Sequence, residues 1–400
     1  MKQRIMTAIV AVSLMLTTGA AAWAQTIKMG VMLPLHDDNG DGRRMVEYYR
    51  GLLMGCDSLK KNGLNIDVHA WNLAEDGNVS AILNDPAAAQ CDLIVGPLYS
   101  KQMPQLSDFV SKHDIKLLIP FSINAPQVET NANIFQVYQS PGEQNETIIR
   151  HFMEQFADCH PVFIDCNDST SKKGVFTAAL RQRMKEAGIE PSITNLKSPE
   201  ESFQKLFSRS QPNVVILNTG RSPELKVAFA KLAGMVTTYP DVKVKVFGYT
   251  EWLMYTKAHL DNFYRFNVYI PSTFFYNPLT TLTSRVEQKY RWNFHQDMQQ
   301  TALPRFAITG FDHALFFLQG LQQQGKQFTG AAGTTGFVPV QTPLHFERVG
   351  KGGASREQNG TRSSSVEAQP ALGVANGGYK NRAMMFVHYM PEHRVETIKF

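Results

Sequence analysis

Short apolar runs alternate with amphipathic stretches along most of this chain. The first example pairs an apolar run at residues 27–33 with a stretch at residues 43–61. In that stretch apolar side chains recur at positions 45, 49, 52, 53, 56 and 59, and Gly63 ends the pattern. A short apolar run predicts a buried strand, and recurrence every three to four residues predicts a helix.

The same alternation continues in two series. The first series predicts strands at residues 27–33, 66–71, 92–95 and 115–119, with helices at 43–61 and 101–113. The second predicts strands at residues 162–165, 192–196, 214–218 and 242–248, with helices at 143–157, 172–187, 200–209 and 223–235. Such alternation indicates parallel sheets built from right-handed crossovers, so we predict an α/β protein of two doubly wound parallel-sheet lobes.

The last third of the chain departs from strict alternation after the apolar and aromatic segment at residues 268–276. It predicts two successive helices and then two strands, at residues 280–298, 305–324, 383–389 and 394–398. Residues 351–376 are rich in Gly, Ser, Ala, Asn and Gln and hold few large apolar side chains. We therefore expect a flexible surface insertion there.

The first residues have the three parts of a secretory signal. Lys2 and Arg4 precede an apolar run at residues 5–16, and Ala22-Trp23-Ala24 has the small-x-small pattern at which a signal peptidase cuts. This predicts cleavage after Ala24 and a periplasmic protein. A membrane anchor is the alternative, but the apolar run is short for the roughly 20 residues that a spanning helix needs.

Length and charge narrow the class of protein. The 376 residues left after cleavage (400 − 24) exceed what one hydrophobic core usually organises, which again indicates two lobes. The formal net charge of +5 becomes +3 once Lys2 and Arg4 are removed. No dense basic run with interleaved aromatic residues is found, so nucleic acid is not an expected partner.

Four cysteines in an exported chain raise the question of disulfides. Cys56 lies on a predicted helix and Cys91 just before a predicted strand, places that can be neighbours in an α/β unit. We predict a Cys56–Cys91 disulfide, which would stabilise the fold by about 4 kcal/mol. Cys159 and Cys166 flank a predicted strand and would lie on the order of 20 Å apart, too far to pair, so buried free thiols are expected there.

The order of these elements resembles the type I periplasmic-binding proteins, the family of leucine/isoleucine/valine-binding proteins. The resemblance covers residues 27–400, and it depends on landmarks at residues 33–35 (Leu-Pro-Leu), 94–97 (Ile-Val-Gly-Pro), 119–126, 248–252 and 310–313 (Gly-Phe-Asp-His). More narrowly, the chain resembles a Bacteroidetes-type envelope subgroup in which this fold often follows a LysM module. A related group, the lipoprotein activators of penicillin-binding proteins, uses the fold to bind a protein.

The resemblance implies a three-segment hinge between the lobes. By this resemblance the chain would cross between lobes near residues 138–142, 270–276 and 336–343. The amino-terminal lobe would then comprise residues 25–138 and 276–336, and the carboxy-terminal lobe residues 139–275 and 337–400.

Ligands of open α/β sheets bind at the carboxyl ends of the strands, and this rule picks out candidate residues in the loops there. On the first lobe the candidates are Tyr99, Ser100, Ser122 and Asn124. On the second lobe they are Asn218, Thr219, Arg221, Glu251 and Trp252.

The resemblance also bears on the ligand. In amino-acid binders the loops that hold Ser100 and Ser122 here supply groups to the ligand carboxylate, and Glu251 falls close to the acid that holds the ammonium. Arg221 stands where those proteins have an aromatic residue, and Asn124 lies where they have a hydroxyl-rich motif. A small polar ligand is therefore implied, amino-acid-like or another metabolite. Arg221 could grip a carboxylate or phosphate, or it could be an exposed residue of a turn.

Two other features leave alternatives open. Residues 37–42 (Asp-Asp-Asn-Gly-Asp-Gly) match the opening of a calcium loop, but Tyr48 stands where the pattern needs Glu, so a polar turn that caps the next helix is favoured. Trp252, Phe274, Phe275 and Tyr276 could stack on a planar ligand or belong to the core.

The motifs of common hydrolases, metalloproteases and nucleotide-binding loops are absent from the sequence. We therefore expect a binding protein that is no enzyme and has no metal or cofactor. Two functions remain. One is an exported solute-binding protein with a small-molecule ligand and an ABC transporter as its partner. The other is an envelope protein that binds cell-wall synthesis proteins or peptidoglycan.

Overall fold

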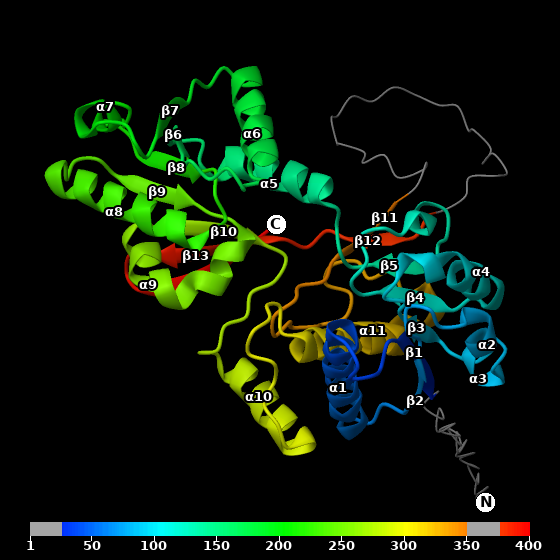
Figure 1. Ribbon diagram of the computed structural model, residues 1–400. Helices are drawn as coiled ribbons and strands as arrows, with labels where there is room; N and C mark the ends of the chain where they lie inside the picture. Colours follow the sequence, from blue (N-terminus) through cyan, green and yellow to red (C-terminus); the bar gives the residue numbers. More distant parts are fainter. Residues whose placement is uncertain (1–25, 350–376) are drawn as a thin grey trace, which may run out of the picture.

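The computed structural model describes residues 26–349 and 377–400 of the chain. The predicted signal sequence at 1–24 and the predicted insertion at 351–376 therefore lie outside the described residues. Two α/β lobes stand side by side (Figure 1), and within the described residues each is built on one seven-stranded sheet. The strands are mostly parallel, which confirms the predicted fold class.

The first sheet has the strand order β11-β12-β5-β4-β3-β1-β2. All neighbours are parallel except β11 and β12. The strands are β1 (Ile27–Leu33), β2 (Ile66–Asn72), β3 (Leu93–Val95), β4 (Lys116–Ile119), β5 (Ile134–Gln136), β11 (Phe346–Arg348) and β12 (Tyr379–Asn381).

Helices cover both faces of this sheet. One core cluster joins α1 (Gly40–Lys61) and α11 (Phe306–Gln324) to one face, and another joins α2 (Val79–Leu83), α3 (Pro86–Ala89) and α4 (Met103–His113) to the other. Helix α10 (Thr281–Phe294) packs against α1 and α11. The short helices of this lobe are η1 (Ser100–Gln102), η2 (Pro126–Glu129) and η4 (Gly325–Gln327).

The second sheet has the order β14-β13-β10-β9-β8-β6-β7, with β13 antiparallel to both of its neighbours. Its strands are β6 (His160–Asp165), β7 (Ser192–Asn195), β8 (Asn213–Leu217), β9 (Val244–Phe247), β10 (Val268–Ser272), β13 (Met385–Met390) and β14 (Arg394–Lys399). Its helices are α5 (Pro141–Gln155), α6 (Gly174–Glu186), α7 (Glu200–Gln204), α8 (Ser222–Thr238), η3 (Thr250–Tyr255) and α9 (Thr256–Arg265).

The chain passes between the two sheets three times. The first passage follows β5 and the second follows β10, close to the expected positions. The third was expected near residues 336–343, and this is wrong because β11 and β12 still belong to the first sheet. The passage lies instead between β12 and β13, at residues 382–384. Of the described residues in the range 337–400, those from β13 onward join the second sheet, and β11 and β12 belong to the first.

The predicted Cys56–Cys91 disulfide is also wrong. Both residues are buried free cysteines, as are Cys159 and Cys166. Cys56 belongs to the core on the α1 face of the first sheet, whereas Cys91 belongs to the core on the opposite face. The first sheet therefore lies between the two thiols.

The residues with the calcium-loop pattern form a helix start. Helix α1 begins at Gly40, and the side chain of Asn39 accepts a hydrogen bond of 2.8 Å from the Gly42 amide. This is the N-cap arrangement, here made by an Asn and not by an Asp. Among the described residues no cluster of three or more His, Cys, Asp or Glu side chains could hold a metal ion. None of the described helices combines the length and the apolar character that a membrane span requires.

Candidate functional site

The carboxyl edges of both sheets are directed at the passages between the lobes. The chain leaves the first sheet from the carboxyl end of β5 and the second from the carboxyl end of β10. Since β12 is parallel to β5, and β13 is antiparallel to β10, the third passage joins the same two edges. Loops after the other parallel strands therefore belong to the edges at which the two lobes meet.

On the first lobe, these loops bring two of the predicted serines together. The Oγ atoms of Ser100 and Ser122 lie 3.1 Å apart. The Ser122 hydroxyl also accepts the Asn124 amide at 3.2 Å, and Gln136 donates to the Ser122 carbonyl at 3.0 Å. The Tyr99 hydroxyl donates to Asp41 at 3.4 Å. The edge of β3 and β4 thus carries a fixed pair of hydroxyl groups.

On the second lobe, Glu251 pairs with a residue that the sequence did not single out. The Nζ of Lys173 lies 2.5 Å from Glu251 Oε1 and 4.6 Å from the centre of the Tyr249 ring. The Tyr249 hydroxyl donates to the Leu217 carbonyl at 2.6 Å, and burial raises the pKa of this tyrosine far above its ordinary value. Lys173 is the N-cap residue of α6, at the end of the loop that follows β6. The sequence pattern predicted a helix from residue 172 onward, so Lys173 was not among the residues predicted for the strand-exit loops.

Arg221 lies at the start of α8 with half of its side chain exposed. Its Nη1 donates to the Thr170 hydroxyl at 3.1 Å and lies 3.6 Å from the Asp168 carboxylate. A further carboxylate, that of Glu224, is 3.5 Å from its Nε. The guanidinium is therefore held in place at the edge, with part of its surface open to solvent.

Three other predicted residues of the second lobe make their contacts within the lobe itself. Trp252 is fully buried, donates to the Thr219 carbonyl at 3.2 Å and packs against Gly248. The prediction that its indole contacts a ligand is therefore wrong, because the ring belongs to the core of the lobe. The buried Thr219 donates to Asp168 at 2.8 Å, and Asn218 bridges the Cys166 amide and Asp165.

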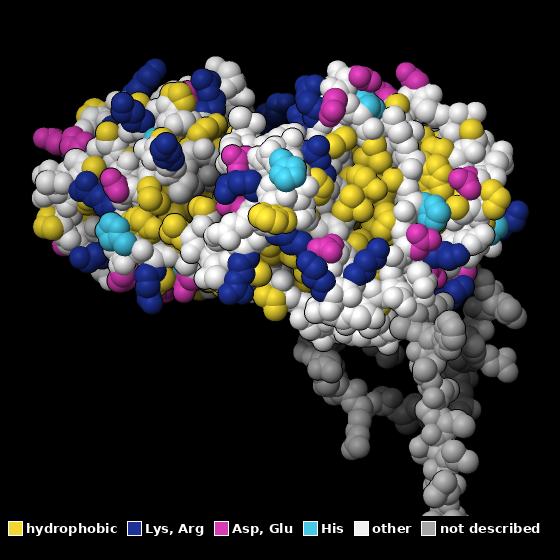
Figure 2. Space-filling model, turned by 90° about the horizontal axis from the view of Figure 1, so that it is seen from below, with side chains coloured by type: hydrophobic (Ala, Val, Ile, Leu, Met, Phe, Trp, Pro, Cys, Tyr) yellow, Lys and Arg dark blue, Asp and Glu magenta, His cyan; other side chains and the backbone are white. Residues whose placement is uncertain are grey.

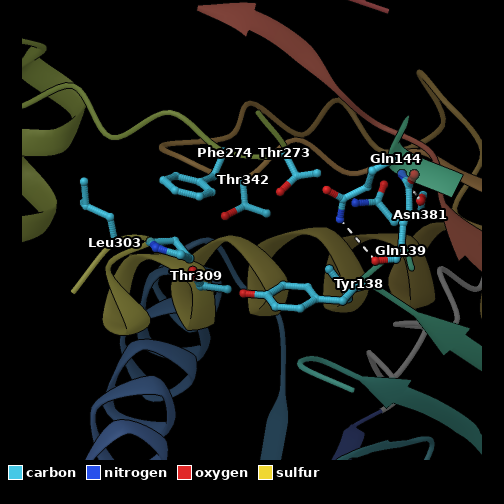
Figure 3. A pocket seen from close by; sticks show the side chains of 11 residues that line it. Tyr138, Gln139, Gln144, Thr273, Phe274, Leu303, Thr309, Thr342 and Asn381 are labelled. Atoms are coloured by element: carbon cyan, nitrogen blue, oxygen red, sulfur yellow. Dashed lines mark hydrogen bonds between the residues drawn. The ribbon is translucent and has the colours of Figure 1, made fainter. Parts of the chain in front are cut away.

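A cavity of about 310 Å³ lies where the three passages meet (Figure 3). Its walls include residues of the first two passages, the last residue of β12 before the third passage, and other residues of the first lobe, among them Tyr138, Gln139, Thr273, Phe274, Thr342 and Asn381. None of the nine predicted ligand-binding residues lines it. Of the aromatic residues predicted to stack on a ligand or join the core, Phe274 forms part of its wall.

Two buried polar atoms at this cavity lack hydrogen-bond partners among the described residues. They are Oε1 of Gln139 and Oγ1 of Thr342. The other side-chain group of Gln139, its Nε2, donates to the Asn381 carbonyl at 2.7 Å. Burial raises the pKa of Tyr138 to about 12, so its phenol stays neutral. Local sequence patterns do not predict this cavity, because its walls come from segments far apart in the chain.

No protein-family model matches the chain. No curated protein matches it either. Solved structures do: a putative branched-chain amino acid ABC transporter protein from Rhodospirillum rubrum aligns with a TM-score of 0.53 and 14% identity, over 82% of this chain and 99% of that one. Full-length LpoA from Haemophilus influenzae aligns with a TM-score of 0.52 and 14% identity, over 94% of this chain.

The protein has the type I periplasmic-binding-protein fold. The chain spans 59% of the length of LpoA, and at such identities the likeness concerns the fold alone. The resemblance inferred from the strand-exit landmarks is thus confirmed at the level of fold. The Bacteroidetes-type subgroup and its link to LysM modules stay predictions.

Proposed function

We propose that this protein captures a small polar ligand between its two lobes. The observation that carries the proposal is the position of Arg221 and the Lys173–Glu251 pair at the carboxyl edge of the second sheet. That edge is joined by all three passages to the edge of the first sheet that carries Ser100 and Ser122.

These groups suit a ligand with an anionic end. Half of the Arg221 side chain is exposed, so its guanidinium can donate to a carboxylate or phosphate in addition to its contacts within the protein. Glu251 could hold an ammonium group if the ligand displaced Lys173 from it. Serine hydroxyls and backbone amides of the first lobe would complete the site when the lobes close by hinge motion. Amino acids and other small metabolites fit this description.

The proposed setting is the bacterial envelope, after export through the predicted signal sequence. Delivery of the ligand to an ABC transporter is the proposed physiological role. The Rhodospirillum rubrum structure of the same fold is described as a putative branched-chain amino acid ABC transporter protein, which supports this role.

The test is a thermal melt of the purified protein with a panel of amino acids and small carboxylates, supported by a native mass spectrum. A ligand at 100 times its Kd should stabilise the protein by about 2.7 kcal/mol. Arg221→Ala should abolish the shift for anionic ligands. Arg209→Ala is the matched control. The Arg209 side chain is 52% exposed, against 50% for Arg221, and it forms an ion pair of 3.0 Å with Asp241. Arg209 precedes β8, whereas Arg221 follows it, so Arg209 does not lie at the carboxyl edge of the sheet. Equal losses in both variants would contradict the proposed site.

A second candidate function is binding of a cell-wall synthesis protein or of peptidoglycan. It is favoured by large apolar side chains exposed around α10, since Leu279 is 90% exposed and Trp292 82% exposed. Hydrophobic side chains also gather on the lower face of the first lobe (Figure 2). Under this proposal Trp292→Ala should weaken retention of the protein by purified peptidoglycan or by a cell-wall synthase, and Arg221→Ala should not.

A further inference from the structure

We propose that the outer edge of strand β14, with the groove beside it, is a docking site for an extended segment of a partner protein. The segment would join the second sheet as one more strand and turn apolar side chains and one acidic side chain into the groove. The site is separate from the proposed small-ligand site, because none of Ser100, Ser122, Lys173, Arg221 and Glu251 lines the groove. Either proposal can therefore fail without the other.

Strand β14 has one open edge. It pairs only with β13, and two backbone bonds between Met384 and Phe400 fix which of its residues face that neighbour. Alternate residues of an antiparallel pair bond to each other, so the N–H and C=O groups of Val395, Thr397 and Lys399 point away from β13. Nothing among the described residues bonds to these groups. They form the row of donors and acceptors with which an added strand pairs.

The open edge is accessible along its length. Strand β14 is six residues long and pairs with β13 in unbroken register, so no bulge turns the edge away. Its four polar residues are exposed, and its two apolar residues are only partly buried. A partner strand can therefore reach the unpaired row.

A groove of about 280 Å³ lies beside the same strand. Its walls come from β14, from Met385 of β13, from the second passage and from residues 339–341 and 343 of the first lobe. The Phe275 amide of the second passage donates to the Gln341 carbonyl at 2.9 Å, which joins two of these walls. Alternate side chains of an added strand point to one face of the sheet, so they can enter the groove. The segment would thus contact both lobes.

Apolar side chains suit this groove. Phe, Pro, Val and Met residues supply much of its lining. Large aliphatic side chains also flank it, since Leu279 is 90% exposed next to the lining residue Thr280, and Val338 is 70% exposed next to Pro339. Exposed apolar groups that gather beside a groove are typical of a protein-binding surface.

The charges at the groove favour an acidic side chain on the partner. Among the described residues, Glu396 and Lys399 are its charged lining residues. Glu396 already pairs with His388, at 3.0 Å, whereas Lys399 forms no ion pair within the described part of the chain. An exposed ion pair contributes little energy, so the backbone bonds and apolar contacts would supply most of the affinity.

The experiment measures binding of a fluorescein-labelled peptide, Thr-Val-Thr-Glu-Thr-Val-Thr-amide, to the full chain by fluorescence anisotropy. Its sequence is the same in both directions, so the probe suits either orientation of the added strand. One matched peptide is methylated on its backbone nitrogens, and another has Lys in place of Glu. We expect saturable binding of the first peptide, at least tenfold weaker binding of the methylated one and at least threefold weaker binding of the Lys peptide. No saturable binding, or equal binding of the methylated peptide, overturns the proposal.

Two variants locate the peptide. Thr397→Pro removes an outward N–H but no bond to β13, and proline is tolerated in edge strands, so binding should weaken at least tenfold. Thr397→Val keeps the N–H and is the matched control, with unchanged binding. Lys399→Glu should reverse the preference between the Glu and Lys peptides, and it carries the test if Thr397→Pro does not fold. An unreversed preference would place the peptide elsewhere and overturn the proposal.

A second copy of the chain is the other occupant that this edge could take. Sedimentation velocity would then show a dimer whose population falls in Thr397→Pro, and the groove would be an interface between copies. That result overturns the proposal. A monomer at the protein concentrations that saturate the peptide supports it.

Discussion

Asp312 shows how one buried side chain holds part of the hinge region together. Its carboxylate accepts backbone N–H groups from Val340, Gln341 and Thr342, at 2.8 to 2.9 Å. The residue is fully buried in α11. Burial raises the pKa of Asp312 from 3.8 to about 7, although the three hydrogen bonds act in the opposite direction. Residues 340–342 are thereby fixed to the first lobe, which explains why no passage occurs there.

Asp312→Asn should change how stability depends on pH. Between pH 3.8 and about 7 the folded protein holds a proton on Asp312 that the unfolded chain has released. This group therefore makes the free energy of unfolding fall as pH rises through that window, by at most about 1.4 kcal/mol per unit. The Asn variant lacks this contribution, so its stability relative to the wild type should increase from pH 4.5 to 7.5.

Urea unfolding of both proteins across that range checks the prediction. The neighbouring His313, whose pKa burial lowers to about 3, has the opposite effect on stability but is present in both proteins. Its contribution cancels in the difference. A difference in stability that does not vary with pH would contradict the assignment.

The cysteines allow a second prediction about single residues. Burial raises the pKa of Cys56, Cys91 and Cys166 to about 12 and that of Cys159 to about 11, so few thiolates form near neutral pH. Without any reductant, the folded protein should react slowly with a thiol reagent, and the urea-unfolded protein should show four thiols. A count of two thiols in the unfolded protein would show that two of the cysteines form a disulfide.

At the scale of elements, helices α1 and α11 pack against each other with backbone in direct contact. A Cβ added to Gly51 would overlap the carbonyl oxygen of Ala307, and one added to Gly310 would overlap that of Tyr48. The two helices approach so closely because neither residue has a side chain at the contact. Both helices also contribute side chains to the core on one face of the first sheet.

Gly310→Ala should therefore lower the free energy of unfolding by about 1–3 kcal/mol, because the helices must move apart. Gly234→Ala is the control, since Gly234 lies within α8 and a Cβ there meets nothing within 4 Å. Because alanine has a higher helix propensity than glycine, Gly234→Ala should stabilise the protein by about 0.5–1 kcal/mol. Chemical denaturation measures both. Equal destabilisation by the two variants would show that the helix contact is not the cause.

Comparison of the predicted with the observed elements shows which parts of the fold the sequence pattern predicts. Long, periodic segments such as α1 and α11 were predicted within a few residues, and the alternation of strands and helices predicted both lobes. The three-residue strands β5 and β12 were missed because so short a run has no detectable period. The equally short β3 was predicted because its three residues form an uninterrupted apolar run. The position of the third passage was taken from the family resemblance, and without a prediction of β12 no sequence pattern corrected it. The burial of Trp252 depends on how η3 folds back over Gly248, which no local pattern reveals.

At the scale of the whole molecule, one carboxylate ties two passages together. Glu143 follows the first passage, and its Oε1 lies 3.1 Å from both Lys380 of β12 and Arg382 of the third passage. Its Oε2 accepts the Ser140 amide at 3.0 Å. Burial acts to raise the pKa of Glu143, but the Ser140 hydrogen bonds and Lys380 lower it to about 2. Glu143 therefore stays ionised at physiological pH, and its ion pairs with Lys380 and Arg382 link the two lobes.

Glu143→Gln should loosen the hinge without unfolding either lobe. The amide keeps an acceptor for Ser140 but loses the charge, and a partly exposed ion pair of this kind contributes up to about 1 kcal/mol. Amide hydrogen exchange at residues 137–144 and 380–384 should therefore accelerate about two- to fivefold. Glu129→Gln is the matched control, because Glu129 also pairs with Lys380, at 2.9 Å, but belongs to the same lobe. If both variants accelerate exchange equally, Lys380 stabilises its own strand and the Glu143 cluster does not restrain the lobes.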